Sequence, residues 1–127
     1  MKLLPYKYIA DFTLEIGEID LVKISGSPSR KETNAVGLLE LDYGSKVYRF
    51  DQVGDLNELT IKCEAVEVEG VVIPFAHLQG YITEVDGGAF DKYGFCVSPL
   101  LGVAFDPEHK PWLTVLTKKG LGSWSKV

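Results

Sequence analysis

The N-terminal part of the chain alternates apolar and polar residues with a period of two. Such alternation is typical of a half-buried β-strand, because successive side chains point to opposite faces. The apolar positions that keep this step are Tyr6, Tyr8, Ala10, Phe12, Leu14 and Ile16. The pattern predicts one long strand over residues 6–16, a tight turn at Gly17 and Glu18, and further strand over residues 19–24.

A hairpin is predicted in the next apolar stretch. Residues 36–43 and 46–50 have strand-like composition and are separated by Gly44 and Ser45, a pair that favours a tight turn. The segment before it, residues 25–34, is polar and rich in turn-forming residues, which predicts a surface loop.

Residues 59–69 are predicted to form a strand whose apolar face changes parity near Ala65 and Val66. A strand can change parity without exposing its core side if one extra residue is inserted, so we expect a β-bulge there. The remaining strands are predicted at residues 71–77, 81–85, 93–97, 101–105 and 112–117.

These segments indicate an all-β fold. About eight to ten short strands with frequent turn signals, and little helix, favour a single-domain antiparallel barrel or sandwich. We assign residues 1–117 to this β-domain and residues 118–127 to a basic, Gly- and Trp-containing C-terminal tail. The tail is expected to dock, either on its own domain or on a neighbour.

The composition is that of a soluble globular protein, with 127 residues, 46% of them hydrophobic and 24% charged. The longest apolar runs are far shorter than the roughly 20 residues of a membrane span. The N-terminus begins like a signal peptide, but Pro5 and Lys7 interrupt it and no cleavage site follows. We therefore expect no membrane association and a location in the cytoplasm or in an intracellularly assembled particle.

The charge is unevenly distributed along the chain. Residues 51–91 contain nine acidic residues and one basic residue, whereas residues 110–127 contain four lysines and no acid. A basic tail on an acidic body can attract an acidic partner or a second copy of the same body. Tryptophan is a favoured interface residue, so the predicted interface consists of Trp124, Lys118, Lys119 and Lys126.

An aromatic cluster in the C-terminal third is the candidate for base stacking. Tyr93 and Phe95 are two positions apart, so in a strand both face the same way, and Lys92 precedes them. Residues 80–99 resemble a cold-shock domain, with Tyr93, Gly94 and Phe95 matching its aromatic-Gly-Phe core. That family's lysine-glycine pair and second aromatic motif are absent here. The acidic surroundings weaken phosphate attraction, so we favour a buried strand face and keep nucleic-acid binding as the alternative.

The two cysteines, Cys63 and Cys96, are expected to be buried free thiols. Neither has the spacing of a metal or redox motif, and both fall in strand-like apolar stretches. A nucleophilic role would need His77 within hydrogen-bond reach of one thiol. The sequence leaves open whether these three side chains meet in a pocket.

The turn DPEHKP offers three potential metal ligands, Asp106, Glu108 and His109. Ligands this close in a loop seldom converge on an ion without a distant fourth, so a hydrated turn is favoured. The chain also lacks a phosphate-binding loop or a Ser-His-Asp pattern. We therefore expect no metal and no cofactor, and we lean against an enzyme.

The function predicted first is a non-catalytic structural or accessory β-domain. It would act through protein–protein contacts in a homo-oligomer or a larger assembly, with a virion or phage-tail particle as one setting. One alternative is a single-stranded nucleic-acid-binding, OB-like barrel that uses Tyr93, Phe95 and Lys92. The other is a small ligand-binding or enzymatic barrel with an interior pocket.

Overall fold

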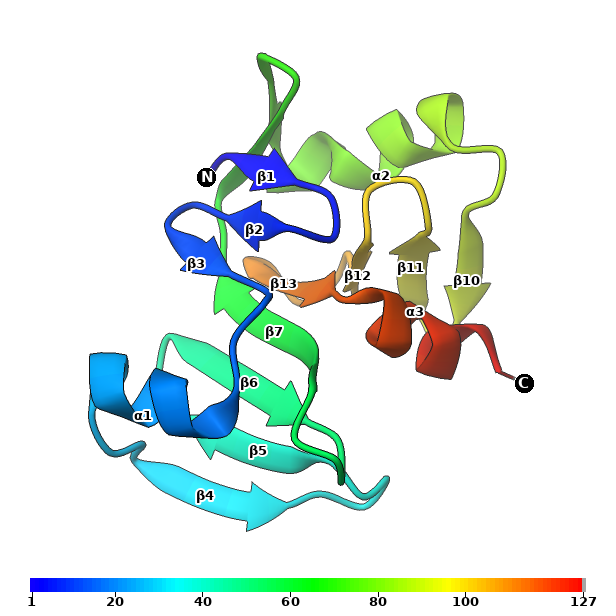
Figure 1. The fold of residues 1–127 in the computed structure, drawn as a ribbon. Coiled ribbons are helices and arrows are strands. Elements are labelled where there is room, and N and C mark those ends of the chain that lie inside the picture. The colour runs from blue at the N-terminus through cyan, green and yellow to red at the C-terminus, as the bar shows by residue number, and fades with distance from the viewer. Residues whose placement is uncertain (127) are drawn as a thin grey trace.

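The computed structural model describes residues 1–126 and is mainly β, with 40% strand and 21% helix. The β-rich class is confirmed, but three helices occur where little helix was predicted, and within residues 1–126 the strands do not close into a barrel. The elements in chain order (Figure 1) are β1 (Leu3–Leu4), β2 (Tyr8–Ile9), β3 (Phe12–Thr13), α1 (Glu18–Ser25), β4 (Arg30–Thr33), β5 (Leu39–Asp42), β6 (Lys46–Phe50), β7 (Leu56–Lys62), β8 (Ala65–Val68), β9 (Val71–Pro74), α2 (Phe75–Val85), β10 (Phe90–Lys92), β11 (Phe95–Ser98), β12 (Val103–Phe105), β13 (Trp112–Leu116) and α3 (Lys118–Ser125).

Eight strands form the main sheet, in the order β10-β11-β12-β13-β7-β6-β5-β4, and all neighbouring pairs are antiparallel. Strands β1–β3 form a second sheet, and β8 and β9 form a third. The predicted β5–β6 hairpin is confirmed, and Gly44 supplies the positive φ of its turn (+88°). Strands β12 and β13 also lie within the residues predicted for them.

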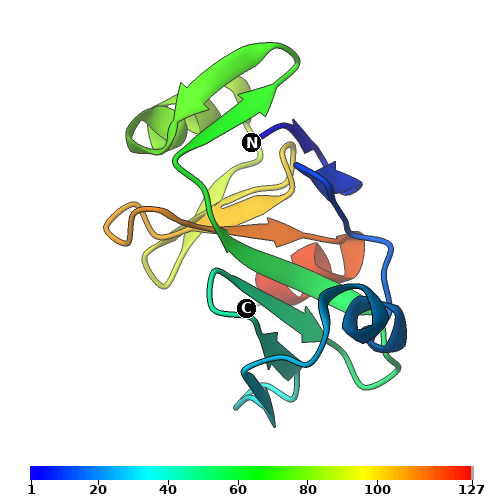
Figure 2. The same ribbon diagram turned by 90° about the vertical axis from the view of Figure 1, so that its left-hand side faces the viewer.

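The main sheet has an inner face that carries the core and an outer face. Along β7, Leu59 and Ile61 are buried on the inner face, whereas Glu58 and Thr60 lie on the outer face. Helices α1 and α2 and both small sheets contribute side chains to the large core cluster of the inner face. Helix α3 packs on the outer face, so α1 and α3 lie on opposite sides of the sheet (Figure 2).

The N-terminal alternation does not produce one long strand, so that prediction is wrong. Tyr6 and Ala10 adopt positive φ angles of +64° and +51°, and the chain reverses at both places to form β1, β2 and β3. Leu3 and Ile9 are buried, although Ile9 stands at a position that the alternation placed on the polar face. In this meander, the turns rather than the period of two determine which side chains reach the core.

Two segments predicted as strands are helical. Residues 19–24 lie in α1, and residues 81–85 lie in α2, which follows β9 directly. Phe75, Leu78 and Ile82 are buried and follow the spacing of three and four residues that places side chains on one helix face. The aromatic and β-branched composition favoured strands in the prediction, and packing against the core overrides this preference.

The predicted β-bulge near Ala65 and Val66 is also wrong. Strand β7 ends at Lys62, and β8 begins at Ala65 in a separate two-stranded sheet. The apolar parity therefore changes because the chain leaves the main sheet. An irregularity does occur between β6 and β7, where the register shifts between Arg49 and Phe50.

Strand β4 is an exposed edge within the segment predicted as a loop. Arg30 forms ion pairs with Glu32, Glu40 and Asp42, and Lys31 pairs with Glu18 on α1 at 2.6 Å. Charged residues on an edge strand discourage pairing with another chain. This edge of the main sheet is therefore protected.

The C-terminal segment forms α3, which begins after the N-cap residue Thr117. The Thr117 hydroxyl accepts a hydrogen bond from the Gly120 amide at 3.1 Å, and its own amide donates to the Asn57 carbonyl at 3.0 Å. These bonds join the start of α3 to β7. None of the helices in residues 1–126 has the length and apolar character needed to cross a membrane.

Candidate functional site

Helix α3 covers one half of the outer face. Leu121 and Trp124 pack on a small apolar cluster made by Val97, Ala104 and Leu116, one residue from each of β11, β12 and β13. The helix can approach closely because a Cβ added to Gly120 would lie only 2.0 Å from the Asn57 carbonyl oxygen. The apolar side chains of these three strands therefore determine where the helix sits.

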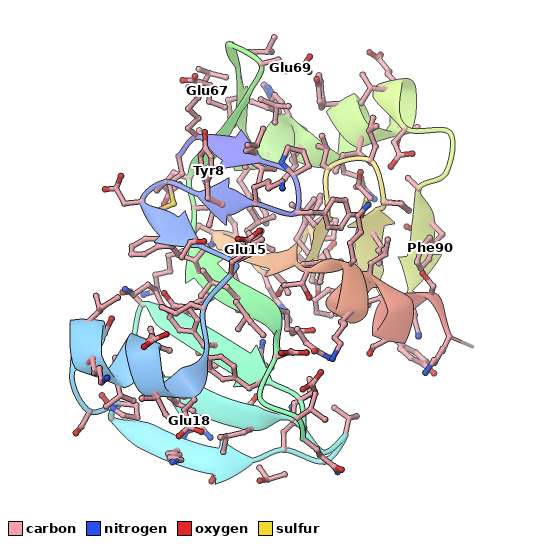
Figure 3. All side chains as sticks on the ribbon, in the orientation of Figure 1. Tyr8, Glu15, Glu18, Glu67, Glu69 and Phe90 are labelled. Atoms are coloured by element: carbon pink, nitrogen blue, oxygen red, sulfur yellow. The ribbon has the colours of Figure 1, made fainter. Side chains whose placement is uncertain are left out.

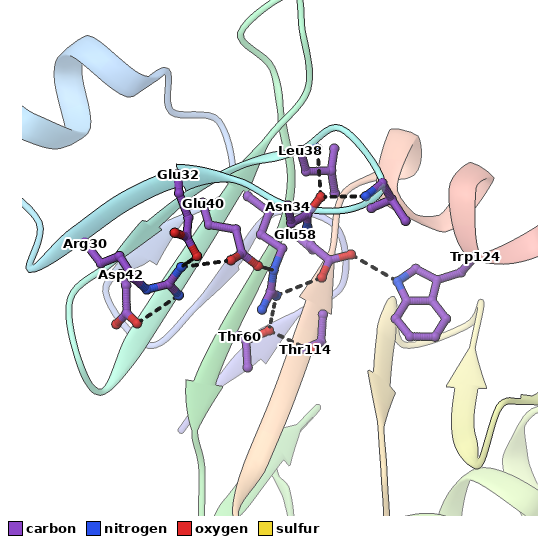
Figure 4. A network of polar contacts seen from close by, with 12 residues as sticks. Arg30, Glu32, Asn34, Leu38, Glu40, Asp42, Glu58, Thr60, Thr114 and Trp124 are labelled. Carbon is purple, nitrogen blue, oxygen red and sulfur yellow. Dashed lines mark hydrogen bonds and ion pairs between the residues drawn. The ribbon is translucent and has the colours of Figure 1, made fainter.

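The other half of the outer face, over β5, β6 and β7, carries a polar network around Arg49 (Figure 4). The Arg49 guanidinium donates from Nε to Glu40 at 2.6 Å and from Nη1 to Glu58 at 2.9 Å and to Thr60 at 2.7 Å. Thr60 also shares a hydrogen bond of 2.8 Å with Thr114 of β13. Four strands are thus linked by side chains on this face.

The Arg49 network sets the ionisation of Glu40. Burial by itself disfavours the charged carboxylate, but the hydrogen bond and charge of Arg49 outweigh this effect, so the pKa of Glu40 lies below its ordinary value. Glu40 is therefore held as an anion. Glu58, which also bonds to Arg49, has 12% of its side chain exposed. This arrangement suits a rigid recognition surface rather than a proton-transfer site.

A groove of about 630 Å³ lies between α3 and the loop that joins β12 to β13, over the polar network. Its size is within the range of ligand-binding sites. We call it the outer-face groove. Its lining residues are Arg49, Glu58, Thr60, Phe95, Asp106, Glu108, His109, Lys110, Trp112, Thr114 and Trp124, so both tryptophans of the chain contribute.

A second hollow of about 370 Å³ shares Arg49, Glu58 and Trp124 with the outer-face groove. It is bounded by the β4–β5 loop, which contributes Val36, and by the β10–β11 turn, which contributes Tyr93. Trp124 therefore contributes to the lining of both hollows.

The four residues predicted as a protein interface lie in or next to α3, where each makes contacts within the chain. Trp124 packs against Phe95 with ring centroids 5.2 Å apart, and its indole N–H donates to Glu58 at 3.1 Å. Lys119 bonds to Asp55 at 2.6 Å and Asp51 at 3.1 Å. Nζ of Lys118 lies 3.8 Å from the centroid of the Tyr6 ring. The backbone carbonyl of Lys126 accepts a hydrogen bond from Nζ of Lys92.

The three residues of the nucleic-acid alternative do not form a common platform. Tyr93 and Gly94 make the β10–β11 turn, with φ of +53° and +83°, and the Tyr93 side chain is 89% exposed. Phe95 starts β11 and lies against Trp124, while Lys92 donates to the Trp124 carbonyl at 2.8 Å. Tyr93 was expected within a strand, and its place in the turn separates its ring from that of Phe95.

Cys63, Cys96 and His77 do not form a common site in the part of the chain that the structure describes. Both cysteines are buried free thiols, as expected. Burial raises the pKa of each thiol. His77 was expected on a strand but lies exposed on α2. Among residues 1–126, no hydrogen bond joins His77 to either thiol, so the groups needed for a Cys-His nucleophile are not assembled there.

The turn at Asp106 is a hydrogen-bonded loop. The Asp106 carboxylate accepts from the Glu108 amide at 2.9 Å and lies 3.1 Å from Nδ1 of His109. In the part of the chain that the structure describes, no group of three or more His, Cys, Asp or Glu side chains is placed to hold a metal ion. The turn instead forms one wall of the outer-face groove.

Sequence reasoning missed Arg49, Thr60, Thr114 and Trp112 as neighbours. They lie on three strands, and they are brought together by the pairings of Thr60 with Thr114 and of Lys62 with Trp112 between β7 and β13, and by the pairing of Arg49 with Glu58 between β6 and β7. Their common outward parity was visible in the sequence, since each alternates with a buried apolar residue. The strand order that joins these parities into one face was not visible.

Sequence reasoning predicted a strand at residues 71–77, which contains β9, but it did not show that β9 lies at the edge of a sheet. In residues 1–126 this strand pairs only with β8, and its residues Val71 and Val72 are 50% and 62% exposed. An edge strand with exposed valines and no charge of its own is open to pairing with another strand.

Comparisons with protein-family models, with curated proteins and with solved structures found no match for this chain.

Proposed function

We propose that the protein is a non-catalytic accessory domain that acts through protein–protein contact, with strand β9 as its contact edge. The observation that carries this proposal is the unpaired, apolar edge formed by Val71 and Val72. The assembly would be a homo-oligomer, and a virion or phage-tail particle remains the larger setting that we propose from the sequence.

A comparison of two edge strands, β4 and β9, supports this choice because they differ in chemistry. Strand β4 carries Arg30, Lys31 and Glu32, which discourage strand addition, whereas β9 has the sequence Val-Val-Ile-Pro. Strands β8 and β9 form a hairpin at the top of the molecule in Figures 1 and 2, so its edge is accessible. Glu67 and Glu69 belong to this hairpin but not to β9 (Figure 3).

A second copy of the chain is the partner that we propose for this edge. Two β9 strands related by a two-fold axis can pair antiparallel and bury their valines against each other, and no charge on β9 opposes this pairing. The side chains of Lys118, Lys119 and Trp124 already make contacts within the chain, which favours β9 over the tail as the contact surface.

Size-exclusion chromatography with light scattering, over a range of protein concentrations, tests the proposal. We expect concentration-dependent dimers, and we expect Val72→Lys to raise the dissociation constant about tenfold or more, because it places a charge on the edge. Val53→Lys is the matched control, since Val53 is 77% exposed on a distant loop. A protein that is monomeric throughout, or dimers that Val72→Lys leaves unchanged, would overturn the proposal.

A further inference from the structure

The outer-face groove presents flat aromatic surfaces beside hydrogen-bonding groups. Trp112 and Trp124 are half-buried, so each ring is fixed by packing and still partly accessible. The ring of Phe95 packs against that of Trp124, with an angle of 46° between the ring planes. Nζ of Lys62 lies 5.2 Å from the centroid of the Trp112 ring. Aromatic faces of this kind pack well against C–H groups, which are weak donors to the π system.

The floor and the loop side of the groove retain capacity for hydrogen bonds. Within residues 1–126, Nη2 of Arg49 makes no hydrogen bond, although Nε and Nη1 are fully used. Nδ1 of His109 lies 3.1 Å from the Asp106 carboxylate, so Nε2 is the ring nitrogen that can bond to a ligand. The His109 side chain is 73% exposed. A ligand that carries both donors and acceptors could therefore use these groups without breaking the network.

The charges that line the groove and the adjoining hollow cancel. Arg49, Lys92 and Lys110 are positive, and Glu58, Asp106 and Glu108 are negative, so three charges oppose three when His109 is neutral. Polyanions need a positive surface that replaces their counterions. The balance therefore disfavours a nucleic-acid strand and favours an uncharged ligand.

The backbone beneath the groove is already paired, because β7 bonds to β6 on one side and to β13 on the other. An extended peptide that was buried here would find few main-chain partners and would leave its own amides unsatisfied. Hydroxyl groups, in contrast, bond readily to side chains such as Arg49, Thr114 and His109. A ligand rich in hydroxyls matches the surface better than a peptide does.

From these features we infer that the outer-face groove is a binding site for a neutral oligosaccharide. The apolar face of a sugar ring packs on Trp112 or Trp124, and its hydroxyls bond to Arg49 and His109. This site is separate from the β9 edge, and its function does not depend on self-association.

The test is a glycan array followed by calorimetric titration, with cellohexaose, maltohexaose and chitohexaose as the first neutral probes. We expect at least one neutral glycan to bind, and we expect Trp112→Ala to weaken that binding about tenfold or more. His109→Ala is a second variant, since the exposed His109 side chain contributes little to the fold, and it is expected to weaken binding severalfold. Circular dichroism establishes that each variant is folded.

Ile24→Ala is the matched control, because Ile24 is 78% exposed on α1, on the opposite side of the sheet, and should leave the affinity unchanged. A heparin oligosaccharide and a ten-nucleotide oligothymidylate serve as anionic probes. The proposal would be overturned if no neutral glycan binds, if both groove variants bind as well as the wild type, or if only the anionic probes bind. Val72→Lys should bind glycans normally, so failure of this proposal and failure of the proposed self-association are distinguishable.

Discussion

The two halves of the outer face show how one sheet can both hold a helix and leave a site open. Over β11, β12 and β13 the outward residues Val97, Ala104 and Leu116 are apolar and fully buried beneath α3. Over β5, β6 and β7 the outward residues include Glu40, Arg49, Glu58 and Thr60, which are partly exposed and are joined by hydrogen bonds and ion pairs.

The difference arises from which side chains the strands point outward. Because Gly120 has no side chain, α3 can contact β7 closely, and the apolar surface that it buries on the outward residues stabilises the helix despite its two glycines. Charged residues that form hydrogen bonds and ion pairs with one another can stay at the surface without a helix packed over them, because their polar groups are already paired. The groove lies at the boundary between these two halves, where Trp124 contacts both.

The largest effect on the free energy of unfolding is expected at the contact between α3 and β7, which lies in the half of the outer face that α3 covers. Gly120→Ala places a methyl group 2.0 Å from the Asn57 carbonyl oxygen, so the backbone must move and α3 must shift from the sheet. We expect a loss of about 3 kcal/mol or more in the free energy of unfolding, measured by urea denaturation.

Gly122→Ala is the matched control for this change. A Cβ at Gly122 meets nothing within 4 Å, and alanine has the higher helix propensity. We therefore expect no loss, or a gain of up to about 1 kcal/mol. Equal stability of the two variants would contradict the close packing of α3 on β7.

A smaller effect is expected at the boundary itself. Trp124→Ala removes the contact with Phe95 and the hydrogen bond to Glu58, and we expect a loss of about 2 kcal/mol, since the side chain is only half-buried. Trp124→Phe keeps an aromatic ring but removes the N–H donor, so a loss of about 1 kcal/mol is expected. Thermal unfolding measures both, and a tryptophan that can be truncated without loss would show that α3 is not anchored by this residue.

The smallest effect is expected in the open half and depends on pH. Arg49→Met leaves Glu58 without its cation and Glu40 with only the longer ion pair to Arg30, at 3.4 Å, and we expect a loss of about 1–2 kcal/mol at pH 7. In the wild type the folded pKa of Glu40 is depressed, so its stabilising contribution is complete above its ordinary value and is lost as the pH falls through the folded value.

In Arg49→Met burial still raises the pKa of Glu40, and only the hydrogen bonds of Asn34 and Arg30 still lower it, so its folded pKa should rise toward its ordinary value. The ionised form of Glu40 then stabilises the variant less than it stabilises the wild type at neutral pH. We therefore expect the difference between wild type and variant to shrink as the pH falls below about 4. Urea denaturation from pH 7 to pH 3 measures this, and a difference that is constant with pH would exclude the role assigned to Arg49.

The sequence predicted those parts of the fold that depend on neighbouring residues. The β5–β6 hairpin follows from two strand-like segments on either side of Gly44, and β13 follows from a mainly apolar segment that only Thr114 interrupts. The burial of Cys63 and Cys96 follows from the apolar segments around them. In these cases local composition and the structure favour the same outcome.

Prediction failed where contacts distant in sequence decide the conformation. The apolar residues of α2 fit both a strand and a helix, and packing of Phe75, Leu78 and Ile82 against the core selects the helix. The N-terminal alternation was read as one strand, but turns at Tyr6 and Ala10 allow Leu3 and Ile9 to reach the core.

The sequence by itself determined that this protein is rich in antiparallel β-structure, because alternation and turn residues act locally. Only the tertiary structure decided the order of the strands, and with it the face on which Arg49, Thr60, Thr114 and both tryptophans meet. The physical reason is that the direction of each side chain is fixed by its own strand or, for Trp124, by helix α3. Their proximity depends on pairings between strands that are far apart in the chain and on the packing of α3 against them.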